Sequence, residues 1–157
     1  MAREIERKFL VKRDAWVPRD PGVPFTQGYL SSQKERVVRV RLEGTVAKLT
    51  VKGLTSGISR LEFEYDIPAT DAVEMLDALC ERPLISKHRH METHDGLIWE
   101  IDVFHGENDG LIVAEVELPS EHTDIILPAW AGEDVSSNPR YFNANLIANP
   151  YANWKSS

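Results

Sequence analysis

The N-terminal segment 3–11 carries a charged side chain at every second position. If this segment is a strand, its side chains alternate between two faces, so Glu4, Glu6 and Lys8 share one face. Two neighbouring carboxylates can bind a divalent cation, and an ammonium group beside them can bind phosphate. The triplet alone is a weak signal, because most charged rows on strands simply face water.

The same alternation returns in later segments of the chain. Arg39 and Arg41, for example, are separated by one residue, as are Lys87 and Arg89. If every such segment is a strand, the acids that share the charged face are Glu4, Glu6, Glu62, Glu64, Glu100, Asp102, Glu115 and Glu117. The bases on that face are Lys8, Arg39, Arg41, Lys48, Lys52, Arg60, Lys87 and Arg89.

These two sets of charges indicate a particular ligand. Clustered carboxylates favour a hard divalent cation, whereas arginine and lysine rows favour phosphate groups. Together they are typical of a site for a metal-bound polyphosphate, in which basic side chains also stabilise charge during phosphoryl transfer. The sequence has no glycine-rich phosphate loop of the Walker type, so side chains must form the binding site.

The alternating segments predict a fold that is α+β but mainly β, with about eight strands in an antiparallel meander joined mostly by short turns. An open sheet would leave the charged face to water, whereas an eight-stranded antiparallel closed barrel would place it inside. The expected strands are 3–12, 25–30, 36–42, 46–52, 59–67, 84–90, 97–105 and 111–118. Helices are expected outside the barrel at 71–81, capped by Thr70, and within 121–130, with a final helix at 140–148 near one tunnel end.

Length and composition limit the class of protein. The 157 residues suit one domain spanning 1–157, and the net charge of −7 disfavours general binding to nucleic acid. The single cysteine, Cys80, cannot form an internal disulfide, which fits a reducing compartment. No apolar run approaches the ~20 residues that span a bilayer. We therefore expect a cytoplasmic protein that contacts neither nucleic acid nor membrane.

The ordered series of charged pairs resembles the CYTH family of triphosphate tunnel metalloenzymes over nearly the whole chain. The resemblance begins with Glu4-x-Glu6-x-Lys8 and continues with Arg39-x-Arg41, Lys52, Glu62-x-Glu64, Lys87-x-Arg89, Asp102 and Glu115-x-Glu117. Short bacterial members are also similar at 27–30, 102–104 and 138–141. The resemblance implies an eight-stranded tunnel, dependence on Mg²⁺ or Mn²⁺, a triphosphate substrate and, in many members, a homodimer.

The resemblance also implies roles for individual residues. The implied metal ligands are Glu4, Glu6, Glu115 and Glu117, together with Asp102, while Glu62 and Glu64 would contribute to the placement of metal or water. The phosphate-binding set is Lys8, Arg39, Arg41, Lys52, Lys87 and Arg89. Tyr29 and Lys87 match a catalytic pair of the compact bacterial enzymes, in which a lysine whose pKa is lowered by neighbouring cations can accept a proton from water. A packing role for Tyr29 remains the alternative.

Three functions are compatible with these residues. The first is hydrolysis of inorganic triphosphate (PPPi) to pyrophosphate and phosphate, favoured by the short chain and the Tyr29–Lys87 match. The second is a class IV-type adenylate cyclase or a nucleoside or thiamine triphosphatase. The third is a polyphosphate-binding module without catalysis. His88 and His90 alternate out of phase with Lys87 and Arg89, so they are expected outside the tunnel.

Overall fold

The computed structural model describes residues 3–154, so residues 1–2 and 155–157 of the expected domain lie outside it. The strands are β1 (Arg3–Val11), β2 (Val23–Gln33), β3 (Arg36–Glu43), β4 (Val46–Lys52), β5 (Ser59–Ile67), β6 (Ile85–His94), β7 (Leu97–Phe104), β8 (Ile112–Glu117) and β9 (Ala131–Asp134). The helical elements are α1 (Ala69–Ala78) and the 3₁₀ turns η1 (Gly106–Asn108), η2 (Pro139–Tyr141), η3 (Asn143–Leu146) and η4 (Tyr151–Asn153). No helix within residues 3–154 has both the length and the apolarity to cross a membrane.

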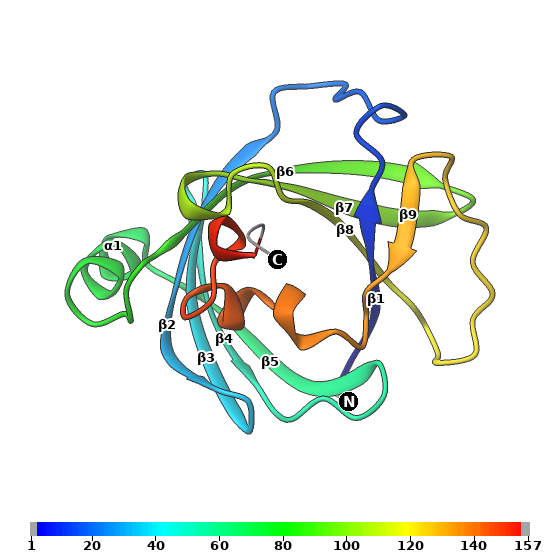
Figure 1. Cartoon of the computed structure of the whole chain (residues 1–157). Helices are drawn as coiled ribbons and strands as arrows, with labels where there is room; N and C mark the ends of the chain where they lie inside the picture. The colour runs from blue at the N-terminus through cyan, green and yellow to red at the C-terminus, as the bar shows by residue number, and fades with distance from the viewer. Residues whose placement is uncertain (1–2, 155–157) are drawn as a thin grey trace.

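Eight antiparallel strands form a closed ring, which confirms the predicted barrel (Figure 1). Their order is β5-β4-β3-β2-β6-β7-β8-β1, and β1 closes the ring by pairing residues 3–5 with β5. Beyond these residues β5 departs from β1, and β9 takes its place along that edge. The sequence did not predict β9. Together β5 and β9 cover that edge of β1, so its backbone groups have partners on both sides.

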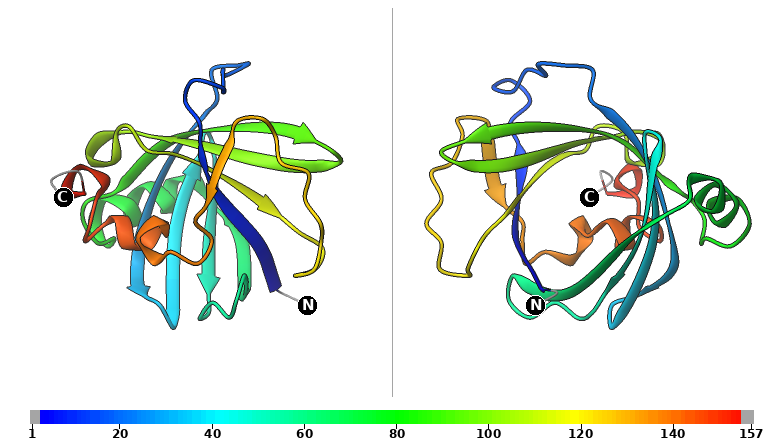
Figure 2. Two further views of the ribbon diagram at one scale, coloured as in Figure 1. Left: turned by 45° about the vertical axis from the view of Figure 1, so that its right-hand side comes forward. Right: turned by 180° about the vertical axis from the view of Figure 1, so that it is seen from behind.

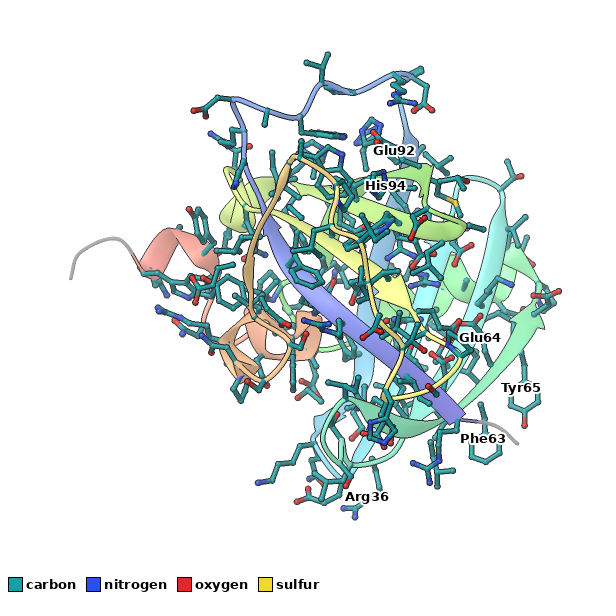
Figure 3. All side chains as sticks on the ribbon, turned by 90° about the vertical axis from the view of Figure 1, so that its right-hand side faces the viewer. Arg36, Phe63, Glu64, Tyr65, Glu92 and His94 are labelled. Atoms are coloured by element: carbon teal, nitrogen blue, oxygen red, sulfur yellow. The ribbon has the colours of Figure 1, made fainter. Side chains whose placement is uncertain are left out.

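The period-two alternation correctly predicts which side chains face the interior. The register aligns Tyr29 with Arg39 and Arg39 with Thr50, and side chains of directly paired residues lie on one face. Figure 3 shows the consequence on β5, where Phe63 and Tyr65 project outward and Glu64 points inward. β2 is longer than predicted, because β3 and β6 pair with its two edges and hold its polar end in the sheet.

The helix α1 packs outside the ring against β3 and β4 (Figure 1). Ala72 and Leu76 are its buried residues, and they form an apolar cluster with Val40, Ala47 and Cys80. Val73 and Leu79 are exposed, so the buried face of this helix is narrow. The helix begins after Pro68, and Thr70 lies inside it, so Thr70 does not supply the predicted cap.

The two other predicted helices are wrong. Residues 121–130 run without regular structure toward β9, with Ile125 packed on the outer core. Pro119 precedes this segment, and Pro128 lies within it, where a proline interrupts helical hydrogen bonding. The region predicted as helix 140–148 contains the separate turns η2 and η3, and η4 follows it.

The outer face of β1, β7 and β8 is covered by loop side chains. Trp16 and Trp130 pack with Phe9 and Trp99 in the largest apolar cluster. The Trp99 ring lies 5.5 Å from both the Phe9 and the Trp130 rings, centroid to centroid. These three tryptophans are therefore packing residues.

One end of the tunnel is apolar and is filled by the C-terminal segment. Tyr29, Ile85 and Phe104 form this part of the inner wall, and Leu146 and Ile147 pack against it. Figures 1 and 2 show the segment after β9 lying within the outline of the ring. The C-terminal segment thus lies at a tunnel end, as predicted, although as 3₁₀ turns.

Trp99→Ala should reduce the free energy of unfolding by about 3–5 kcal/mol, because the ring is fully buried between two aromatic neighbours. Urea unfolding measures the change. Ile98→Thr is the matched control, since Ile98 is on the same strand but 54% exposed, and should change stability by about 0.5 kcal/mol or less. A small effect of Trp99→Ala would contradict the assignment of the core.

Candidate functional site

The charged inner face surrounds a cavity of about 820 Å³. Strands from all sides of the ring contribute to its wall, and the segment 136–145 contributes further residues at one side. The predicted site residues on this wall are Glu4, Glu6, Lys8, Tyr29, Arg39, Arg41, Lys52, Glu62, Glu64, Lys87, Arg89, Glu115 and Glu117. Arg60 and Glu100 also line it. The tertiary structure therefore brings together residues from both ends of the chain.

Four carboxylates form the acidic side of this cavity, namely those of Glu4, Glu6, Glu62 and Glu117. The register places Glu6 opposite Glu117 across the β1–β8 pair. Lys52 Nζ lies between two of the others, 3.2 Å from Glu4 Oε1 and 3.4 Å from Glu62 Oε2. Lys52 thus contacts two of the four carboxylates, and Arg60 lies opposite Glu4 across the β1–β5 pair, so this side has more negative than positive groups.

The excess of negative charge is visible in pKa values. Burial raises the pKa of Glu6 well above its usual range, and the charges of Glu115 and Glu4 raise it further. Burial and the Glu4 charge likewise raise the pKa of both Glu62 and Glu117. A cation bound at this position would relieve the repulsion between these carboxylates. Their donor atoms are all oxygens, which fits Mg²⁺ or Mn²⁺.

As they stand, these carboxylates are spread around Lys52 and do not converge on one point. Within residues 3–154, no three histidine, cysteine or acidic side chains are grouped closely enough to hold an ion in this conformation. Lys52 is the cation that separates Glu4 from Glu62. Binding of a divalent ion would therefore require side-chain movement around Lys52.

Glu115 occupies a different environment from the other predicted metal ligands. Its carboxylate lies 3.4 Å from Lys8 Nζ and 3.6 Å from Arg89 Nη2. Burial tends to raise the pKa of Glu115, but Lys8 and Arg89 outweigh it and hold the pKa well below its usual range. Glu115 is therefore a negative charge that joins the acidic side of the cavity to its basic side.

Two arginines of β3 share a glutamate of β5. Glu64 Oε2 lies 3.4 Å from Arg39 Nη2 and 3.8 Å from Arg41 Nη2, and it accepts a 2.9 Å hydrogen bond from Thr50. Arg41 also contacts Glu43 at 2.6 Å. Burial lowers the pKa of Arg41, and the positive charges of Arg39 and Arg89 lower it further. These two guanidinium groups together form a concentrated positive wall.

Asp102 is the one predicted site residue that does not line the cavity; it lies behind Lys87 and Arg89. Arg89 donates two hydrogen bonds to it, at 2.8 and 2.9 Å, and Lys87 Nζ is 2.8 Å away. The carboxylate is 1% exposed. This geometry supports Asp102 as the counter-ion of two phosphate-binding residues, in place of the expected direct metal ligand.

Lys87 is 2% exposed, and burial lowers its pKa to about 7. Asp102 opposes this decrease, and Arg89 adds to it. The expected lowering is therefore present, but desolvation is a larger cause than the neighbouring cations. An amine with this pKa can accept a proton near neutral pH.

Tyr29 lies on the cavity wall and is connected to Lys87 by hydrogen bonds. Gln27 Nε2 donates to Tyr29 Oη at 2.9 Å and to Asn143 Oδ1 at 3.1 Å, and Lys87 Nζ donates to the same Oδ1 at 2.9 Å. Lys8 Nζ also donates to the carbonyl of Tyr141 at 3.0 Å. The sequence analysis did not identify Gln27 or Asn143, because their types and spacing give no sign of this contact.

Phe25 lies beside two arginines of the inner face. The guanidinium carbons of Arg41 and Arg89 are 5.0 and 4.7 Å from the ring centroid. Phe25 also lines a second cavity of about 550 Å³, together with Lys48. Lys48, which shares the inner face with the other bases, therefore lines this second cavity instead of the first, and it pairs with Asp66.

The histidines predicted to lie outside the tunnel do so. His88 Nδ1 is 2.7 Å from His105 Nε2. His90 contacts Asp20 and packs against the Trp16 ring. Both pairs belong to the outer surface of β6 and its covering loops, so they contribute no ligand to the cavity.

Comparison with known proteins identifies similar chains of nearly the same length. A family model described as the CYTH domain matches residues 2–151. A protein of Acetivibrio thermocellus named inorganic triphosphatase is 48% identical over 155 residues, which cover 99% of both chains. A Nitrosomonas europaea protein of the same name is 39% identical, covering 91% of this chain and 95% of that one.

Solved structures show the same arrangement of strands. The crystal structure of an inorganic triphosphatase has a TM-score of 0.64 and 36% identity, covering 92% of this chain and 97% of that chain. A Bacillus halodurans protein has a TM-score of 0.62 at 16% identity, covering 77% of this chain and 84% of that chain. At that identity the likeness shows the fold alone.

Mg²⁺ or Mn²⁺ should raise the melting temperature, since an ion that binds only the folded state at 100 times its Kd contributes about 2.7 kcal/mol. Glu6→Gln should raise the melting temperature of the metal-free protein, because it removes a buried repelling charge, and should diminish the rise caused by metal. Thermal scans with each ion or with EDTA measure both effects. Glu133→Gln, at an exposed position on β9, is the control; an undiminished metal response in Glu6→Gln would contradict the assignment.

Proposed function

The chain belongs to the CYTH-domain family, and we propose that it is a divalent-metal-dependent triphosphatase that hydrolyses PPPi to pyrophosphate and phosphate. The observation that carries the proposal is the enclosed cavity, which combines a repelling carboxylate group with a wall of arginines and lysines. The two relatives named inorganic triphosphatase, which match almost the full chain, support the same substrate.

The basic wall is suited to hold a triphosphate without help from the backbone. Arg39, Arg41 and Arg89 present guanidinium groups, which make forked hydrogen bonds to phosphate oxygens, and Lys8 and Lys52 act as point charges. Glu64, Glu115 and Asp102 balance these cations when no substrate is bound and fix their positions. Phosphate oxygens would take over part of this pairing, so the substrate binds in an already ordered site.

The acidic side is the proposed metal site, with Glu4, Glu6, Glu62 and Glu117 as ligands. When bound there, a divalent cation would withdraw charge from the phosphate oxygens and favour cleavage of the phosphoanhydride bond. Glu115, which lies opposite Lys8 across the β1–β8 pair and contacts its ammonium group, would adjust the charge between metal and phosphate. Mg²⁺ and Mn²⁺ are both compatible with these carboxylate oxygens.

Lys87 is the proposed general base, and Tyr29 is its proposed partner in placing the attacking water. The Lys87 amine is buried in the wall beside the cavity, and its pKa of about 7 permits it to take a proton from water. Tyr29 is buried but on the same wall, where its hydroxyl can orient the water. Arg89 lies next to Lys87 on the inner face and would bind the phosphate under attack.

Phosphate release from PPPi, ATP and thiamine triphosphate, each with Mg²⁺, Mn²⁺ or EDTA, tests the proposed function. We expect metal-dependent release that is fastest from PPPi. Glu117→Gln should slow phosphate release by at least about 10-fold, because losing even a side chain that supports a metal ligand without touching the metal can cost this much. The exposed Glu133→Gln is the control. Faster release from ATP or thiamine triphosphate, cyclic AMP formation from ATP, or tight binding without turnover would each contradict the proposal.

The kcat/KM for PPPi should increase with pH through about 7, because Lys87 can act as a base only after it loses its proton. Lys87→Arg keeps the positive charge but cannot lose it, so it should abolish this limb and reduce the rate by about 10²–10⁴-fold. A rate profile from about pH 5.5 to 9 at saturating metal measures both. A rate that decreases through pH 7 would exclude Lys87 as the base.

A further inference from the structure

A continuous set of hydrogen bonds joins Tyr29 to Lys87 through two amide side chains. Gln27 and Asn143 are the intermediates, with donor–acceptor distances of 2.9, 3.1 and 2.9 Å along the path. Gln27 is fully buried on β2, and Asn143 begins η3 in the C-terminal segment. Two elements that are distant in the sequence therefore meet at the proposed catalytic pair.

The direction of each hydrogen bond follows from the chemistry of Lys87. A lysine ammonium group only donates, so Asn143 must present its carbonyl oxygen Oδ1 to Lys87 Nζ. Because that oxygen accepts, Gln27 must contact it with the amide nitrogen Nε2. The same nitrogen is the atom of Gln27 next to Tyr29, so it also donates to Tyr29 Oη. Since Tyr29 accepts this bond, its own hydrogen remains available for an oxygen atom in the cavity.

The same contact restrains the amino group of Lys87. Nζ is 2.8 Å from Asp102 Oδ2 and 2.9 Å from Asn143 Oδ1. These two acceptors take two of the three positions around the nitrogen. The remaining position is where the nitrogen can meet a water molecule or a phosphate oxygen. Asn143 therefore determines the direction in which Lys87 approaches the cavity.

The orientation of the Gln27 side-chain amide is not explained by packing alone. Its Oε1 atom is buried and has no hydrogen-bond donor among residues 3–154, although both contacts of Nε2 are made. Buried amide oxygens are nearly always satisfied, so an unsatisfied one needs an explanation. The orientation of this side chain is thus the one that serves Tyr29 and Asn143.

We propose that Asn143 and Gln27 are positioning residues for the reaction, with Asn143 directing Lys87 and Gln27 directing Tyr29. This inference rests on the proposed function. It assigns the C-terminal segment a part in catalysis, beyond filling the apolar tunnel end with Leu146 and Ile147. The competing explanation is that Asn143 Oδ1 only occupies the place of a phosphate oxygen until substrate arrives.

Steady-state kinetics with PPPi and Mg²⁺ or Mn²⁺ separate these explanations. Asn143→Ala and Gln27→Met should each lower kcat by about 10²-fold, the cost of a misplacement near 1 Å, and should leave KM nearly unchanged. The double variant should be little worse than either single variant, because the residues act as a unit. Asn143→Asp keeps the acceptor oxygen, so it should restore much of kcat, with a higher KM because its charge repels phosphate.

The matched control is Asn149→Ala, an exposed asparagine on the same segment whose backbone carbonyl accepts from Trp154 Nε1. It should retain the kcat and KM of the unmodified protein. Melting temperatures of all variants show whether each remains folded at the assay temperature. If Gln27→Met fails to fold, Asn143→Ala and Asn143→Asp still test the positioning role, since Asn143 is only half-buried and its replacement should be tolerated.

Two results would overturn the inference. Unchanged kcat in folded Asn143→Ala would show that Lys87 needs no positioning by this residue. A lower KM with unchanged kcat would show that Asn143 merely competes with substrate. Absence of PPPi hydrolysis by the unmodified protein is a separate result, which would refute the proposed function; kinetics of the same variants on whichever triphosphate is then cleaved would still decide the role of Asn143.

Discussion

The enclosure of many charges inside a closed ring is the constraint on which the rest of the structure depends. Removing an ionised side chain from water is costly unless an opposite charge or a hydrogen bond replaces the water. The clearest response is Asp102, which is 1% exposed and neutralises Lys87 and Arg89 from behind the cavity wall. Glu64 similarly joins Arg39 to Arg41. These pairs let the basic wall exist before any phosphate binds.

On the acidic side of the cavity the buried charges are not fully balanced by opposite charges, and this imbalance favours binding of a cation. Burial, together with the charges of Glu115 and Glu4, raises the pKa of Glu6, so the folded protein retains repulsion that a cation would remove. Burial also lowers the pKa of Lys87 to about 7, although Asp102 is in contact with it. The features that reduce stability are therefore those that suit a metal-dependent hydrolase.

The C-terminal segment connects the packing of the tunnel to its chemistry. Leu146 and Ile147 fill the apolar end of the inner wall, and this packing places Tyr141 and Asn143 against the charged part. The carbonyl of Tyr141 accepts from Lys8, while Asn143 accepts from Lys87. Packing of two apolar side chains thus places two polar groups against lysines of the cavity wall.

The sequence by itself determined eight of the strands and the set of charges on their inner face, because the faces of a strand follow from a period of two residues. Only the tertiary structure decided that Asp102 lies behind the wall, that Lys48 lines a second cavity, and that Gln27 and Asn143 meet. It also replaced two predicted helices with an extended segment and 3₁₀ turns. The physical reason is that local periodicity specifies a direction for each side chain, whereas its partners come from strands and segments that only folding brings together.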